Sequence, residues 1–349
     1  MGFQPDMDAR KRRILEAVTD DYINTAEPVG SRTIARRYNL GVSPATIRNE
    51  MADLEESGYL EQPHTSAGRI PSEKGYRFYV DFIMKRKPVS EDERARIRRT
   101  LAERRREIEL IIEETARILA QLSKYAAFVL SPISKAGVFK RIELLPVDSM
   151  NVLVVLVIDP GFVRTHLVAT GHPLTRQQLA NIAEFLNSRL ANLPLSRIGA
   201  SLLREIKAEL DEYNTFVDAA LEAIAQSLED RHEEQVYSDG QVNLLEQPEF
   251  QDISKARTVL EFLAEDDALY ALLSGVVEAR GVTVMIGREA GHPSMKPCSI
   301  VSAPYEVRGV PMGALGVVGP TRMHYSRVVA LVEFVAENLG DVLTRILLM

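Results

Sequence analysis

The sequence predicts a multidomain α+β protein that begins with a winged helix-turn-helix. Helical periodicity recurs three times within the first 60 residues, and a short polar hairpin with a glycine follows it. Farther along, apolar strand-like runs flank a long helical stretch. At 349 residues the chain is long enough for two or three domains.

Three helices are expected at the N-terminus. The first begins near Asp8 and ends before the breaker segment 27–30. Ser31 is expected to cap a short second helix, and Ser43 followed by Pro44 predicts the start of a third, which Gly58 ends. The expected buried positions of the first two helices are Ile14, Leu15, Val18, Tyr22, Ile34, Ala35 and Tyr38.

The third helix has the surface that a DNA-reading helix requires. Its apolar positions Ile47, Met51 and Leu54 lie on one side, which leaves a small, polar face with Asn49 and the flanking Thr46 and Arg48. Asn and Arg make bidentate contacts to base edges in the major groove. Ser43, Thr46 and the helix N-terminus can bind phosphates. The alternative is a three-helix domain with a solvated polar face.

The hairpin after this helix favours DNA binding over that alternative, because it would form a wing. Two short strands, near 59–62 and 69–70, enclose a polar loop in which Gly68 permits a tight turn. A wing lies along the backbone or the minor groove. The candidate wing contacts are His64, Thr65, Ser66 and Arg69, and the candidate backbone contacts are Arg36, Lys74 and Arg77, with Arg32 and Arg37 as further cations.

A long helix is expected next, from the capping box of Ser90 and Glu93 to about residue 124. Its heptad-like apolar stripe fits a dimerisation coiled coil or, in the favoured interpretation, a connector packed on the next domain. Beyond it, strands are expected at 141–145, 151–158, 165–169, 282–286, 299–305 and 313–318. They enclose an acidic, mainly helical region at 174–274 that is interrupted near 236–251, and a last helix is expected at 326–347. This order suggests one α+β domain with a helical insertion.

The charge is unevenly distributed. The net charge is −7, but the first 106 residues hold 21 Lys and Arg against 17 Asp and Glu, which leaves 21 against 32 in the rest. A small basic module on an acidic body fits nucleic-acid binding. We expect a cytoplasmic protein without a membrane span, because the most apolar run, 152–158, is too short to cross a bilayer.

No pattern in the sequence supports an enzyme, a metal site or a bound cofactor. The six histidines lack ligand spacing, and neither a P-loop nor a nucleophile turn occurs. Gly313, Gly316 and Gly319 lie in an apolar strand, so close packing explains them better than a dinucleotide fingerprint. The single cysteine, Cys298, is expected in the core, with a redox switch as the alternative.

Two long motifs resemble the family of the heat-inducible transcription repressor HrcA. They are the run 43–55 continued through 63–71 and 75–77, and the run 316–323 with Tyr325. Ala290 and His324 depart from the family pattern as we expect it, and both lie outside the DNA-binding part. The resemblance implies a dimeric repressor of chaperone operons that binds the CIRCE inverted repeat and depends on the GroEL chaperonin.

The resemblance also implies a GAF-like body with an inserted dimerising domain. The expected division is a winged helix at 1–88, a connector helix at 89–124, a GAF-like domain at 125–172 and 252–349, and a mainly helical dimerisation domain at 173–251. Heat is expected to disturb the dimer of a marginally stable body. A second hypothesis is that the body binds a metabolite and so controls DNA binding.

Overall fold

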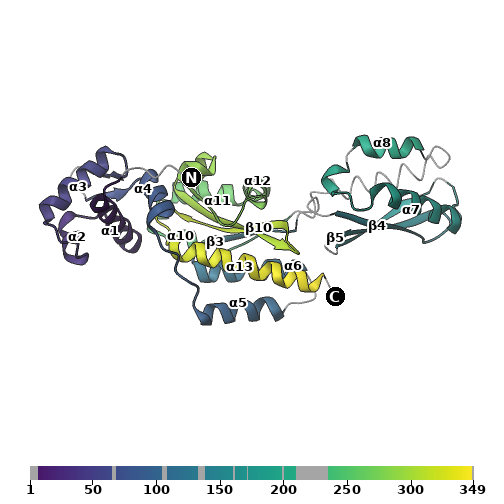
Figure 1. Ribbon diagram of the computed structural model, residues 1–349, viewed down its shortest axis with the longest axis horizontal. Helices are drawn as coiled ribbons and strands as arrows, with labels where there is room; N and C mark the ends of the chain where they lie inside the picture. The colour runs from purple at the N-terminus through teal and green to yellow at the C-terminus, as the bar shows by residue number, and fades with distance from the viewer. Residues whose placement is uncertain are drawn as a thin grey trace.

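The computed structural model describes residues 7–64, 68–103, 108–132, 138–159, 162–170, 172–198, 200–209 and 235–347. Figure 1 shows these residues as three units in a row. We call them the head (residues 7–83), the body (the central unit, which contains β3, β7–β10 and α13) and the small unit (residues 138–209). No helix in the described part of the chain is both long enough and apolar enough to span a membrane.

The head contains the three expected helices and the hairpin. They are α1 (Ala9–Thr25), α2 (Ser31–Arg37), α3 (Pro44–Glu56), β1 (Leu60–Glu61), β2 (Ile70–Pro71), α4 (Glu73–Phe78) and the π-helix η1 (Tyr79–Ile83). Of the apolar positions expected to be buried, Ile14, Leu15, Val18, Ile34, Ile47 and Leu54 are at most 1% exposed. Tyr22, Ala35 and Tyr38 are only half-buried and pack against the edge of this core. Helical periodicity therefore placed these elements correctly.

One local expectation for the head is wrong. Ser31 does not cap α2, because Gly30 occupies the N-cap position and Ser31 is the first helical residue. The turn in which Gly68 was expected lies largely outside the described residues, but a close approach requires this glycine, since a Cβ there would lie 2.4 Å from the Val29 carbonyl oxygen. Val29 and Arg69 exchange backbone hydrogen bonds of 2.9 Å in both directions. The hairpin is thus tied to the α1–α2 connection, which the sequence did not indicate.

The body is built on a five-stranded antiparallel sheet in the order β7-β3-β10-β9-β8. Its strands are β3 (Ala126–Leu130), β7 (Val236–Asp239), β8 (Thr283–Ile286), β9 (Cys298–Val307) and β10 (Val310–Pro320). Helices α6 (Ile108–Ser123) and α13 (Tyr325–Ile346) pack on one face, and α11 (Ile253–Leu263) and α12 (Asp266–Val277) on the other. The short helices α10 (Val242–Leu245), η6 (Pro248–Phe250), η7 (Gly287–Ala290) and η8 (Pro293–Met295) complete it.

Strand β10 shows why its three glycines are needed. A Cβ at Gly313, Gly316 or Gly319 would lie 2.4, 2.7 or 2.6 Å from the nearest atom of Tyr305, Val301 or Tyr125. Close packing, as expected, explains this spacing. Cys298, on the neighbouring strand, is fully buried, and burial raises the pKa of its thiol to about 12.

The expected long connector helix is wrong as a single element. The segment forms α5 (Glu91–Glu103) and α6 (Ile108–Ser123), and Arg96 of α5 donates to the side chain of Gln121 of α6. In one continuous helix these residues, 25 positions apart, would lie roughly 37 Å apart. In Figure 1, α6 lies beside α13 and α5 lies below them, and each of the three helices contacts the other two. The apolar stripe therefore packs on the body as a hairpin of two helices.

The small unit has its own sheet and core. Strands β4 (Val138–Pro146), β5 (Asn151–Asp159) and β6 (Phe162–Ala169) form an antiparallel sheet under α7 (Arg176–Leu190), with η3 (Leu195–Arg197) and α8 (Ala200–Glu209) beside it. The sequence placed these three strands with the C-terminal strands, and placed the segment of β7 in the helical insertion. Both assignments are wrong, because the hydrogen-bond pairing puts β4–β6 in a separate sheet and β7 beside β3. Local alternation predicts a strand but not its partner.

Candidate nucleic-acid interface

Helix α3 begins as the sequence predicts. The Ser43 hydroxyl occupies the N-cap and accepts a hydrogen bond of 3.1 Å from the Thr46 amide, and Pro44 takes the first helical position. The buried face of Ile47, Met51 and Leu54 packs on α1 and α2. This packing leaves the opposite face of α3 in solvent.

The exposed face of α3 presents Arg48 and Asn49. Both side chains are exposed, and neither makes a hydrogen bond or an ion pair with another described residue. Ala45 and Ala52 are also exposed, so no large side chain limits the approach of a partner along this face. A guanidinium and an amide on this face can form hydrogen bonds with the donors and acceptors on base edges.

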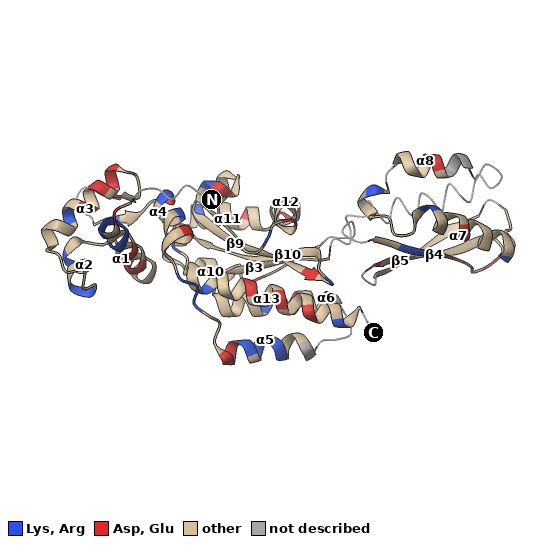
Figure 2. Ribbon diagram, in the orientation of Figure 1, with Lys and Arg blue, Asp and Glu red and all other residues tan. Residues whose placement is uncertain are grey.

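The other cations of the head differ in whether a carboxylate already holds them. Arg36 is exposed and has no partner among the described residues, whereas Arg37 forms an ion pair with Asp21, whose side chain is 7% exposed. Arg10 and Lys11 of α1 pair with Glu50 and Asp53 of α3. Figure 2 shows this mixture of blue and red on α1 and α3. Only part of the positive charge in the head is therefore available to an anion.

Arg69, expected at the wing, is engaged within the head. Its Nε and Nη2 lie 2.8 and 2.7 Å from Glu55 Oε2, and its side chain is 21% exposed. His64 is exposed at the described edge of the loop, while Thr65 and Ser66 lie outside the described residues. The Arg69–Glu55 pair fixes the hairpin to the end of α3.

Lys74 and Arg77 are also occupied. Lys74 Nζ donates to the Ser57 carbonyl oxygen at 2.8 Å and lies 4.3 Å from the centre of the Tyr59 ring. Arg77 donates to both carboxylate oxygens of Glu289 and, at 2.6 Å, to the Val284 carbonyl oxygen of the body. Neither Glu55 nor Glu289 could be identified as a partner from the sequence, because each is distant along the chain from the arginine that it binds.

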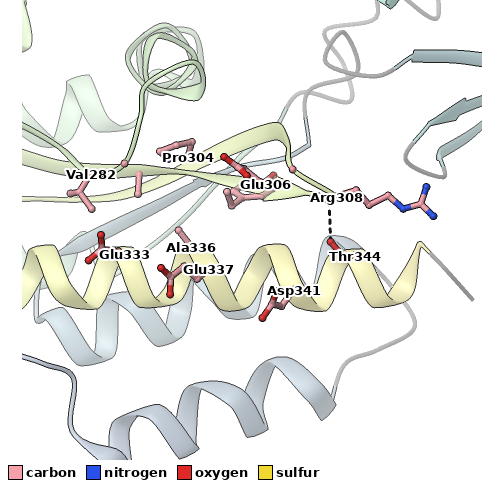
Figure 3. Close-up of a pocket in the computed structure, with 13 residues that line it drawn as sticks. Val282, Pro304, Glu306, Arg308, Glu333, Ala336, Glu337, Asp341 and Thr344 are labelled. Atoms are coloured by element: carbon pink, nitrogen blue, oxygen red, sulfur yellow. Dashed lines mark hydrogen bonds between the residues drawn. The ribbon is translucent and has the colours of Figure 1, made fainter. Parts of the chain in front are cut away.

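The body offers an acidic hollow rather than a second basic surface. A hollow of about 530 Å³ lies between α13 and the end of β9 with the β9–β10 turn, and Figure 3 shows Glu306, Glu333, Glu337 and Asp341 around it. The Arg308 amide donates to Thr344 Oγ1 at 3.3 Å at one end. Such a lining repels phosphates. Among the described residues, no group of three His, Cys, Asp or Glu is arranged to hold a metal ion.

Comparison with known proteins adds the decisive observation. Residues 109–329 match the family model described as the HrcA protein C-terminal domain. The chain is 46% identical to the heat-inducible transcription repressor HrcA of Pelotomaculum thermopropionicum, over 97% of this chain and 98% of that protein. It is 42% identical to the same-named protein of Desulforamulus reducens, over 98% of each chain.

The chain belongs to the HrcA family. The HrcA relatives are named as transcription repressors, which are regulators and not enzymes. A crystal structure described as that of a hypothetical protein has a TM-score of 0.58 and 24% identity, covering 98% of this chain and all of that one. This likeness supports the fold alone. The family resemblance found in the sequence motifs is thus confirmed.

Proposed function

We propose that this chain represses chaperone operons in the cytoplasm by binding the CIRCE inverted repeat as a homodimer. Heat shock releases it from the operator, and the GroEL chaperonin maintains its active state. One observation besides the family supports DNA binding. Helix α3 presents Arg48 and Asn49, which are exposed and have no partner among the described residues, on a helix whose other face is buried. The head then acts as a winged helix on a GAF-like body that needs no cofactor.

The proposed contacts divide into base readout and positioning. Arg48 and Asn49 read base edges in the major groove, while Ser43, Thr46 and the N-terminus of α3 bind phosphates. His64, Thr65, Ser66 and Arg69 form the wing, and Arg36, Lys74 and Arg77 supply backbone contacts. Of these cations, Arg36 contributes most, since Arg69, Lys74 and Arg77 are held by groups of the protein.

The small unit supports the dimer through the outer face of its sheet. Alternate residues of β5, such as Val154 and Leu156, are buried towards the α7 side, so the intervening residues point away from it. On that outer face Leu145 pairs across the sheet with Leu153, and Leu153 pairs with Leu167. Leu145 is 49% exposed and Leu167 65%. A contiguous exposed apolar face of this kind is typical of a protein interface, and a second copy of the chain would cover it.

The dimer is tested with Leu167→Asp, which places a charge on the β6 edge of this face, at its more exposed leucine. We expect sedimentation to show a monomer and gel shifts to show weaker binding to the full inverted repeat. Ile253→Asp is the matched control, because Ile253 is 81% exposed but lies on α11 of the body. A dimer that survives Leu167→Asp would refute this interface.

The function as a whole is tested by binding to a CIRCE-type inverted repeat with and without GroEL, at growth and heat-shock temperatures. We expect preference over a scrambled duplex, loss of binding on heating, and recovery with chaperonin. Equal affinity for the scrambled duplex would contradict the proposal. If the purified protein stays operator-bound well above growth temperature, the heat-release mechanism is wrong.

A further inference from the structure

Arg322 joins three segments that are far apart in the sequence. It lies between β10 and α13 and is 9% exposed. Its Nε donates to Glu249 Oε1 at 2.7 Å and its Nη2 to Glu249 Oε2 at 3.4 Å. Its Nη1 donates to the Ile23 carbonyl oxygen at 2.6 Å. One guanidinium therefore connects the head, the β10–α13 turn and the segment that follows β7.

In the head, Arg322 binds a backbone carbonyl oxygen that would otherwise lack a hydrogen-bond donor. Ile23 lies in the last turn of α1, where carbonyl oxygens have no helical donor. A cation at this end of a helix also interacts favourably with the helix dipole. If the head rotated away, both this carbonyl and a buried guanidinium donor would lose a hydrogen bond. The contact therefore selects one orientation of the head.

The Arg322–Glu249 ion pair is more buried than the exposed Arg86–Glu333 pair, which also lies at the junction between the end of the head and the body. The Arg322 and Glu249 side chains are 10% and 22% exposed, whereas those of Arg86 and Glu333 are 53% and 38% exposed. Exposed pairs contribute little, but a buried charge that loses its partner is strongly unfavourable. Arg77, bound to Glu289 and Val284, is the second polar link. A continuous apolar core also extends from α1 into α13.

We propose that Arg322 is a positioning residue for operator recognition: it sets the orientation of the head on the body, and so the separation of the two α3 helices in a dimer. This inference rests on the proposed function. When one of two heads held at a fixed separation binds a half-site, the other loses little further orientational freedom on binding the second half-site. The spacing of the half-sites must then match the separation of the heads. The residue acts through the head and does not touch DNA.

The test compares Arg322→Met with Arg86→Met, a control in the same junction whose ion pair is exposed. Gel shifts use a single half-site duplex, the CIRCE-type inverted repeat, and repeats whose spacer is changed by one to five base pairs. We expect Arg322→Met to bind the half-site within about twofold of the parent, to bind the full repeat at least tenfold more weakly, and to lose the dependence on spacing. Arg322→Lys keeps the charge and should restore part of that dependence.

Two results would overturn the positioning role: a spacing dependence as steep as that of the parent, or an equal loss on the half-site and the full repeat. If Arg322→Met does not fold, Glu249→Gln is used instead, because it keeps the shape of Glu249 and removes the charge. We expect from it the same pattern with a smaller loss.

A DNA-independent measurement separates this inference from the proposed function. Spin labels at Glu56→Cys in α3 and Lys255→Cys in α11 report the head-to-body distance, and native Cys298 is fully buried. We expect a narrow distance distribution in the parent and a broad one with Arg322→Met. An unchanged distribution would overturn the inference even if the operator is bound. If the parent does not bind the operator but the distance distribution still broadens with Arg322→Met, the proposed function is wrong and the orienting role of Arg322 is supported.

Discussion

We call the surface with Arg36 and Arg48 the outer side of the head, and the surface with Asp20, Arg69 and Arg77 its inner side. Both carry arginines, but the two sides differ in what those arginines already bind. On the outer side, Arg36 and Arg48 are exposed and have no partner among the described residues. On the inner side, Arg69 is held by Glu55 and Arg77 by Glu289. The number of arginines is thus a poor guide to the DNA surface. A guanidinium becomes a phosphate or base ligand at low cost only if no carboxylate has to be displaced.

The largest effect is expected from the buried side of α3. Ile47 is fully buried, so Ile47→Ala should lower the free energy of unfolding by about 2–5 kcal/mol through lost burial and a cavity. Urea unfolding measures this change. Glu56→Ala, an exposed change on the same helix, should stay within about 0.5 kcal/mol of the parent. Equal effects of the two changes would contradict the division of α3 into two faces.

Arg48→Ala tests the outer side for base readout. We expect stability to be unchanged and the preference for the inverted repeat over a scrambled duplex to fall by about 1–3 kcal/mol. Arg48→Lys is the matched control, because it keeps the charge but lacks the planar guanidinium with its fixed pair of donors. Undiminished discrimination in gel shifts with Arg48→Ala would remove Arg48 from the reading surface.

Arg36→Ala and Arg37→Ala compare a cation that has no partner among the described residues with its paired neighbour. Arg36→Ala should weaken binding to all duplexes and reduce the slope of log affinity against log salt by about 0.9, as for one phosphate contact. Arg37→Ala should instead lower the melting temperature, because it leaves Asp21 buried without its cation. The same slope change from both variants would show that pairing within the head does not decide availability.

The smallest effect is expected at Asp20, on the inner side. Burial raises the pKa of this carboxyl above 3.8, although the Tyr79 hydroxyl, which donates to it at 2.7 Å, opposes the shift. A folded-state pKa above the unfolded value gives stability that is present below pH 3.8 and is lost as the pH rises through the folded pKa.

Asp20→Asn should therefore raise stability slightly at pH 7 and flatten the pH dependence in the acidic range. Thermal unfolding at a series of pH values measures both the stability at pH 7 and its pH dependence. Glu16→Gln, an exposed change on the same helix, should leave the curve as it is. A variant that is less stable than the parent at pH 7 would show that the ionised carboxylate is favourable there.

The sequence by itself determined the elements of the head and the exposed face of α3. Ser43 caps the helix, and Ile47 and Leu54 recur on one side, so the orientation of Arg48 follows from helical periodicity alone. The strands of the body were found in the same way, except for the short β3 and β7. Local patterns are sufficient for these features because the residues concerned lie within a few positions of each other.

Only the tertiary structure decided which strands share a sheet, that α5 and α6 fold side by side, and which cations are free. Each of these depends on a partner that is distant in the chain: β7 pairs with β3, Arg77 with Glu289, and Arg322 with the carbonyl of Ile23. Periodicity predicts which side of a helix or strand is buried, but not which residues that side contacts. The helices of the head can therefore be predicted from the sequence, whereas the contacts that attach the head to the body become visible only in the folded structure.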